Sequence, residues 1–214
     1  MKPENNFLSD LKVDKLKTFK KRMMGCILAT DMAKHAEDLA SFKLKLETKG
    51  IKSALNNGSQ FLDRTSGKTL FESQQQMMEV ALHAADVSVP CRPEFGIVRK
   101  WTYLLFEEFF EQGDLEKAEA LPVSFLCDRV TTNVAKSQNG FISFIVQPLF
   151  TQVTELMPGL ACMLDSCRTN KELWDKHEET EQEKKSYVKV DEKPIIESDN
   201  DSSDNSEGSE PSSN

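Results

Sequence analysis

The sequence of 214 residues lacks the signals of secreted, membrane-spanning and metal-cluster proteins. Its five cysteines are odd in number and form no CxxC pair, which argues against a disulfide framework or a zinc ribbon and favours reduced thiols. No apolar run approaches the ~18 residues of a membrane span, and the N-terminal MKPENNF lacks the apolar core of a signal peptide. We therefore expect a cytoplasmic protein with no membrane partner.

Motifs for catalysis are equally scarce. The sequence contains no GxSxG element, no glycine-rich phosphate loop and no HExxH pair. Its only histidines are His35, His83 and His177. Asp31 and His35 are four residues apart, a spacing that suits either a structural pair or a metal-binding pair.

The negative charge is confined to the C-terminal end. The formal net charge is −8, and residues 178–214 hold 12 acidic residues against 4 lysines, whereas residues 1–177 hold 23 acidic and 23 basic residues. A neutral body without a basic stripe argues against nucleic acid as a partner. We expect a folded region over residues 1–177 and an acidic, serine-rich, disordered tail over residues 178–214.

The body is expected to be all-α, because apolar residues recur at helical spacing and no strand pattern competes. The expected helices span residues 14–49, 73–86, about 94–112, about 133–156 and about 160–177. Ser73 is expected to cap the second helix, and Gly113 to end the third. In the third helix, Val98, Trp101, Leu105 and Phe109 form the expected buried stripe. Pro148 should kink the fourth.

Asp86 is the unusual residue of the helix ending in HAAD. A carboxylate at a helix C-terminus lies against the negative end of the macrodipole, which costs ~0.3–1 kcal/mol. Two interpretations remain open from the sequence: an Asx-turn that closes the helix, or a bound metal cation.

Gln138 and Phe141 lie three residues apart near the start of the helix 133–156, and hence on one face. Together they could offer a planar heterocycle a hydrogen-bonding edge and a stacking ring. The spacing is equally compatible with a solvated helix surface.

Several motifs together resemble the catalytic domain of class I cyclic nucleotide phosphodiesterases. These are ILATDMAKH, HAADVSVP, WTYLLFEEFFEQGD, LPVSFLCDR and SQNGFISFIVQPLF, which occur in the family's order. The resemblance extends over most of residues 4–174 and covers roughly the second half of that domain. It implies a multi-helix, all-α phosphodiesterase-like bundle that is truncated on its N-terminal side.

The resemblance also implies roles for four residues. Asp86 matches an aspartate that completes the first metal site, Gln138 matches the glutamine that hydrogen-bonds the purine, and Phe141 and Leu105 match the residues on either face of the base. It further implies metal-dependent hydrolysis of cAMP or cGMP to the 5′-monophosphate, a signal-transduction activity. The implied cofactors are divalent ions, Zn²⁺ with Mg²⁺ or Mn²⁺.

The sequence also departs from the family pattern. The other metal ligands and the general-acid histidine belong to motifs upstream of the matching part, and none of the three histidines here matches them. Val89 stands where many members have a polar residue. We therefore expect an incomplete metal site with no catalytic residue of its own, inactivity of the chain alone, and self-association through exposed apolar surface. The alternative is a non-catalytic helical interaction or regulatory module derived from the family.

Overall fold

The computed structural model of the chain describes residues 8–48 and 67–178. The described residues form helices and no strands, which confirms the all-α prediction. The expected acidic tail, apart from Glu178, lies outside them. The described elements are the helices α1 (Val13–Leu28), α2 (His35–Thr48), α4 (Gly67–Asp86), α5 (Phe95–Ala118), α6 (Val134–Phe141), α7 (Gln147–Leu156) and α8 (Ala161–Asp175), the 3₁₀ turns η2 (Met32–Lys34), η4 (Val89–Cys91) and η6 (Pro158–Leu160), and the π turn η5 (Ile142–Val146).

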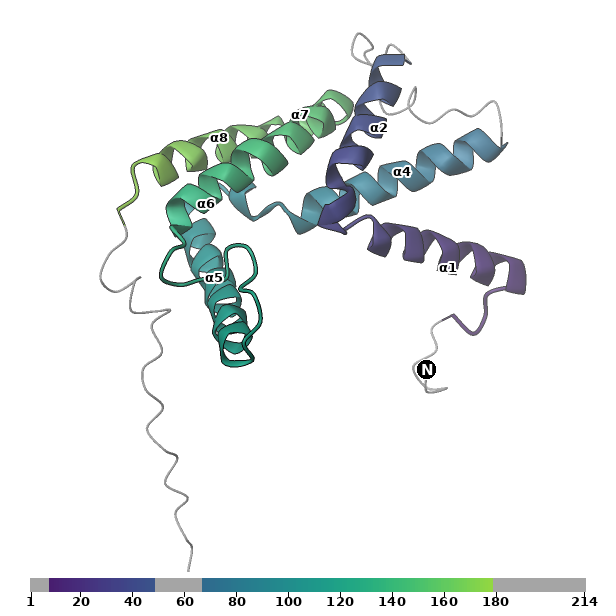
Figure 1. Cartoon of the computed structure of the whole chain (residues 1–214). Coiled ribbons are helices and arrows are strands. Elements are labelled where there is room, and N and C mark those ends of the chain that lie inside the picture. Colours follow the sequence, from purple (N-terminus) through teal and green to yellow (C-terminus); the bar gives the residue numbers. More distant parts are fainter. Residues whose placement is uncertain (1–7, 49–66, 179–214) are drawn as a thin grey trace, which may run out of the picture.

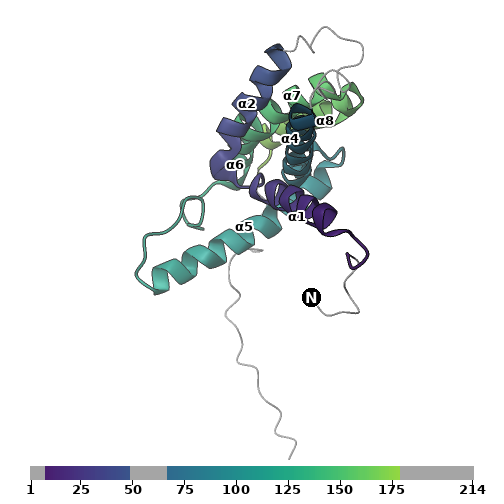
Figure 2. The same cartoon turned by 90° about the vertical axis from the view of Figure 1, so that its right-hand side faces the viewer.

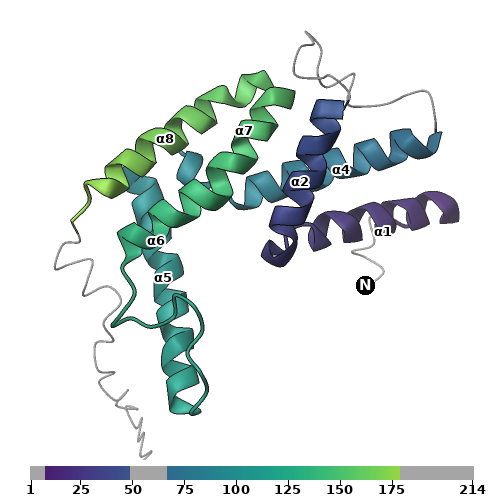
Figure 3. The same ribbon diagram turned by 45° about the horizontal axis from the view of Figure 1, so that its top comes forward.

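The C-terminal helices α7 and α8 lie side by side (Figure 1). Helix α1 packs along α4 on the side of the molecule away from α8 (Figure 3). Helix α5 projects from the body, and the connection to α6 folds back along it (Figure 2). None of the helices among the described residues combines the length and hydrophobicity that crossing a bilayer requires.

The predicted helix over residues 14–49 is wrong, because the chain breaks between α1 and α2. Asp31 is extended and its carboxylate accepts a hydrogen bond from the Ala33 backbone N–H at 3.0 Å. The Thr30 hydroxyl donates to the Ile27 carbonyl at 2.8 Å. These side-chain bonds replace the backbone bonds of a continuous helix and start the 3₁₀ turn η2.

Two further helix boundaries differ from the prediction. Helix α4 begins at Gly67, so Ser73 is an interior residue, fully buried, rather than a cap. Helix α5 passes through Gly113 and ends at Ala118. A Cβ atom at Gly113 would lie 1.9 Å from the Cys127 carbonyl oxygen, so this glycine permits a close approach of the connection after α5 instead of ending the helix.

The helix predicted over residues 133–156 forms in three parts, α6, η5 and α7. The Asn133 side chain accepts from the Lys136 backbone N–H at 2.8 Å and caps α6. The regular pattern is interrupted just before Pro148, which has no N–H to donate within a helix, and the π turn η5 takes up the interruption.

The main core lies between α5, α6, η5, α7 and α8. Its largest fully buried side chains include Trp174, Phe106, Phe110 and Phe150. On α5 the buried face carries Val98, Thr102, Phe106 and Phe110, whereas Trp101 is 59% and Leu105 43% exposed. The predicted buried stripe through Trp101 and Leu105 was therefore wrong, since the helix turns a different face to the core.

Candidate functional site

Asp86 ends helix α4 with an exposed carboxylate. The backbone bonds that close the helix run from Val87 N–H to the His83 carbonyl at 3.2 Å and from Ser88 N–H to the Ala85 carbonyl at 3.2 Å. The Ser88 hydroxyl also donates to the Ala85 carbonyl, at 2.7 Å. Within residues 8–48 and 67–178 no group hydrogen-bonds to the Asp86 carboxylate, so an Asx-turn, one of the two interpretations left open by the sequence, is absent. The carboxylate is left available to an external cation.

Gln138 lies inside α6 and is only 7% exposed. No side chain or backbone group in the described part of the chain hydrogen-bonds its amide. Most of the side chain is covered, but the amide atoms are not fully buried and reach the surface. Gln138 therefore lies on a mostly covered part of α6, with an amide that remains accessible to a ligand.

Phe141 is half-buried one turn after Gln138, at the end of α6. It lines a broad cavity of ≈ 910 Å³ between α6, η5 and the connection that follows α5. Phe125 and Phe144, which are 89% and 78% exposed, lie on the same cavity. The cavity thus offers several aromatic surfaces, whereas Gln138 does not line it.

Leu105 lies on α5, a helix in direct contact with α6. It is 43% exposed and does not line the cavity that contains Phe141. The structure therefore brings Gln138 and Phe141 together on one helix and places Leu105 on the adjacent one. Asp86 is on a third helix, and no described hydrogen bond joins it to the other three.

The connection between α5 and α6 forms one wall of the cavity, and charged side chains attach this wall to α5. Glu116 accepts from the Ser124 backbone N–H at 2.7 Å and from its hydroxyl at 2.6 Å, and these bonds lower the pKa of Glu116. Lys117 donates to Asp128 at 2.8 Å, which lowers the pKa of Asp128. The wall is thereby held in one conformation without covering the cavity.

A second attachment of the wall combines an ion pair with an aromatic contact. Arg129 donates its Nε–H to both carboxylate oxygens of Asp114 at 3.1 Å and lies 5.5 Å from the centre of the Phe110 ring. Sequence reasoning missed these attachments. Their signal was the cluster of charges in DLEK and CDR at the two ends of the connection.

His35 pairs with His83 rather than with Asp31, which corrects the expected Asp31–His35 pair. The His35 Nδ1 and His83 Nε2 atoms are 2.9 Å apart, and both residues are 5% exposed. Burial is the first cause that lowers the pKa of each imidazole. The pair joins α2 to α4 one turn before Asp86 and is a structural contact.

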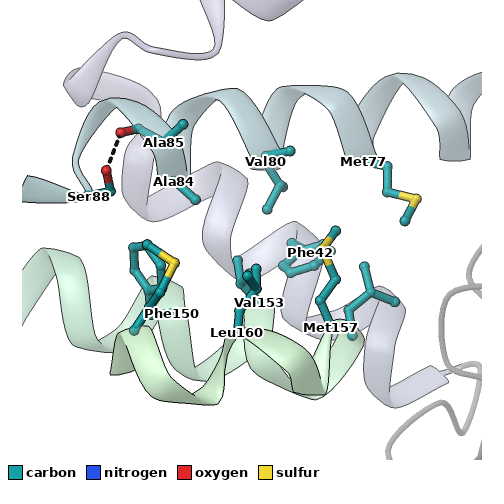
Figure 4. Close-up of a pocket in the computed structure, with 13 residues that line it drawn as sticks. Phe42, Met77, Val80, Ala84, Ala85, Ser88, Phe150, Val153, Met157 and Leu160 are labelled. Carbon is teal, nitrogen blue, oxygen red and sulfur yellow. Dashed lines mark hydrogen bonds between the residues drawn. The ribbon is translucent and has the colours of Figure 1, made fainter. Parts of the chain in front are cut away.

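An apolar cavity of ≈ 200 Å³ lies on the other side of the same helix end. Ala84, Ala85 and Val80 of α4 face Phe150 and Val153 of α7 across it (Figure 4). Its lining carries the Ser88 hydroxyl, which is already bonded to a carbonyl, and no charged group. It therefore offers nothing to an anionic phosphate ester and is not a candidate for the substrate site.

The described residues do not form a complete metal site. No group of three or more histidine, cysteine, aspartate or glutamate side chains among them is placed to hold an ion. A catalytic zinc normally requires three protein ligands, so Asp86 fits as one ligand and is insufficient alone.

Comparison with known proteins gives the chain a family context. The sequence model described as 3′5′-cyclic nucleotide phosphodiesterase matches residues 1–167. The chain is 36% identical over 156 residues to 3′,5′-cyclic-AMP phosphodiesterase 4C of Mus musculus, covering 72% of this chain and 21% of that protein. It is 35% identical over 158 residues to isoform F of the 3′,5′-cyclic-AMP phosphodiesterase of Drosophila melanogaster, covering 73% of this chain and 22% of that protein.

Solved structures agree with the sequence comparison. LmjPDEB1 in complex with IBMX superposes with a TM-score of 0.67 at 28% identity, over 81% of this chain and 48% of that one. The phosphodiesterase domain of the RhoPDE fusion protein from the choanoflagellate Salpingoeca rosetta gives a TM-score of 0.65 at 28% identity, over 80% of this chain and 50% of that one. The chain therefore spans about a fifth of these curated relatives and about half of these solved structures.

Proposed function

This chain belongs to the 3′,5′-cyclic nucleotide phosphodiesterase family, and from that premise we propose that it supplies the base-binding half of a hydrolase for cyclic nucleotides, with cAMP as its substrate. The named relatives are cyclic-AMP phosphodiesterases, which favours cAMP over cGMP. The observation that carries the proposal is the amide of Gln138, which has no described hydrogen-bond partner and lies one turn from Phe141.

The roles proposed for these residues follow from their chemistry. The Gln138 amide has donors and an acceptor, so it can pair with the edge of a purine. Phe141 provides a ring face for stacking, worth about 1–3 kcal/mol for a nucleic-acid base. Leu105, on the adjacent helix α5, supplies apolar surface for the opposite face of the base.

Asp86 is proposed as one ligand of a divalent metal ion in a complete domain, with Zn²⁺ and Mg²⁺ or Mn²⁺ as the family's ions. Its carboxylate is exposed and has no described hydrogen-bond donor. A cation there would also offset the unfavourable end of the helix dipole. Because the described residues supply only this ligand, we propose that the chain alone does not hydrolyse cyclic nucleotides.

A second candidate function is a non-catalytic interaction module. The observation that favours it is the apolar surface of α1, where Met23, Met24, Ile27 and Leu28 are between 45% and 58% exposed. Such a surface suits contact with another protein or a second copy of the chain.

A chimeric enzyme tests the proposed function. The part of the mouse relative that precedes its match would be fused to this chain, and cAMP hydrolysis measured with added zinc and magnesium. We expect turnover by the chimera and none by the chain alone. Asp86→Ala should abolish turnover, and Gln138→Ala should lower kcat/KM for cAMP by tenfold or more, at about 1.4 kcal/mol per factor of ten.

Matched substitutions control for damage to the fold. Asp165→Ala removes another exposed carboxylate, and Gln152→Ala removes another buried amide, so both should leave kcat/KM within about threefold of the unmodified chimera. A folded chimera that fails to hydrolyse cAMP would reject the enzymatic proposal and favour the interaction module.

A further inference from the structure

Two buried cysteines from distant parts of the sequence meet behind the turn that follows Asp86. Cys91 ends the turn η4 and is 2% exposed, and Cys167 lies on α8 and is fully buried. The two elements pack directly on each other, and both thiols are reduced. Each thiol is close enough to shift the pKa of the other, and the pKa of Cys91 is raised while that of Cys167 is lowered.

The backbone on both sides of Cys91 is held against the same face of α8. The Asn170 side chain donates to the Pro90 carbonyl at 2.8 Å and to the Arg92 carbonyl at 2.6 Å. Asn170 is 1% exposed and follows Cys167 by three residues, so both residues project from one face of the helix. These bonds hold the segment that carries Cys91 against the face of α8 that carries Cys167.

We propose that Cys91 and Cys167 form a disulfide upon exposure to a hydroperoxide, which makes the pair an oxidative modification site. The remaining cysteines lie elsewhere: Cys26 on α1, Cys127 in the connection after α5, and Cys162 at the exposed start of α8. The proposal depends on packing between η4 and α8 and is independent of cyclic nucleotide hydrolysis.

Cys91 and Cys167 have different roles in the proposed oxidation. Cys167 is the attacking sulfur, because the neighbouring Cys91 thiol lowers the pKa of Cys167 and so favours its thiolate. Its thiolate attacks one oxygen of hydrogen peroxide, the O–O bond breaks, and the products are a sulfenic acid and hydroxide. The Cys91 thiol gives its proton to that hydroxide, and its sulfur then attacks the Cys167 sulfur.

This second step forms the S–S bond and breaks the S–O bond, and the sulfenic oxygen leaves with its hydrogen as hydroxide. That hydroxide neutralises the proton that Cys167 lost when its thiolate formed. In total, two thiols and one hydrogen peroxide give one disulfide and two waters. Hydrogen peroxide is close to water in size, so a local opening of the three-residue turn η4 is sufficient for it to reach Cys167.

The disulfide would act on the turn that carries Val89 and begins just after Asp86. It would join η4 covalently to α8, at the point where Asn170 already holds it through hydrogen bonds. Oxidation should therefore make the end of α4 more rigid, while reduction restores its freedom.

Peptide mapping of the oxidised chain tests the proposal. The purified reduced protein is treated with hydrogen peroxide, unfolded, alkylated and digested. We expect a peptide pair linked through Cys91 and Cys167, and a fall from five free thiols to three. A thiol reductant should reverse both changes, and the linked protein should melt about 5–10 °C higher than the reduced one.

Cysteine variants make the assignment specific. The double variant Cys26→Ser and Cys162→Ser should still form the link, whereas Cys91→Ala and Cys167→Ala should each abolish it. Because the mapping is done on the natural sequence, the result does not depend on the folding of the buried variants. The proposal is overturned if exposed Cys162 is oxidised while Cys91 and Cys167 stay reduced, or if the links join other cysteines.

Discussion

The region formed by α6, α7 and α8 uses its apolar residues differently from helix α1. In the first region, Val146, Leu149 and Trp174 are buried against other helices. Helix α1 has no buried residue at all, and its contact with α4 is largely polar, since Arg22 bonds to Gln74 at 2.9 Å and the Gln75 amide bonds to the Arg22 carbonyl at 3.1 Å. The region of α6, α7 and α8 therefore supplies most of the stability of the chain, whereas α1 presents its side chains at the surface.

Removal of the Trp174 side chain should cause the largest loss of stability, because Trp174 belongs to the buried region. Its ring is 1% exposed and lies 5.1 Å from Phe95 and 6.3 Å from Tyr103, measured between ring centres. Trp174→Ala should lower the free energy of unfolding by about 3–5 kcal/mol in urea denaturation. A loss below about 1 kcal/mol would show that the C-terminal helices are not the stabilising region.

A smaller loss is expected for Gly113→Ala. The new Cβ atom would lie 1.9 Å from the Cys127 carbonyl oxygen, a backbone atom that cannot turn aside. We expect a loss of about 1–3 kcal/mol in the free energy of unfolding. Gly140→Ala is the control, because a Cβ atom at that position would have no neighbour within 4 Å and alanine favours a helix, so it should be neutral or stabilising.

Acid should weaken the junction between α2 and α4. The pKa values of His35 and His83 are lowered in the folded protein, chiefly by burial. The unfolded chain therefore binds protons more readily, and the free energy of unfolding should fall as the pH drops below about 6.5, the ordinary histidine value. Urea denaturation at several pH values measures this slope. His83→Gln should reduce it, and an unchanged slope would assign the acid sensitivity to other groups.

The smallest change in stability is expected on α1. Ile27 is 58% exposed, so Ile27→Ala should alter the free energy of unfolding by less than about 0.5 kcal/mol. We expect the natural chain to self-associate and to bind hydrophobic dyes through this helix, and Met24→Glu together with Ile27→Glu should reduce both, as measured by light scattering and fluorescence. If the double variant associates as strongly as the natural sequence, another surface is responsible.

The sequence was sufficient for the fold class and for most helices, because apolar spacing is a local property. The prediction failed where contacts between residues far apart in the sequence determine the structure. The two faces of α5 are both apolar, and only packing against α6 and α8 selects Phe106 over Leu105 for the core. Gly113 was assigned to a helix end because its contact with Cys127 involves a later part of the chain.

The candidate site was predictable to a similar degree. Spacing alone left open whether Gln138 was solvated or buried, and only the family resemblance gave it a role. Only the structure shows that most of the Gln138 side chain is covered while its amide has no described partner. The pairing of His35 with His83 spans 48 residues and has no local signal. The break at Asp31, in contrast, could have been read from its capping position before Ala33.

The π turn η5 allows one continuous stretch of helix to face two different directions. A π turn adds one residue to the helix and so shifts the angular phase of everything that follows by about 100° relative to an uninterrupted α-helix. Without that shift, α6 could not direct Phe141 to the cavity while α7 turns Phe150 and Val153 to the core. Deleting a single residue between 142 and 146 would thus misalign the two halves, although every individual side chain of the site remained in the sequence.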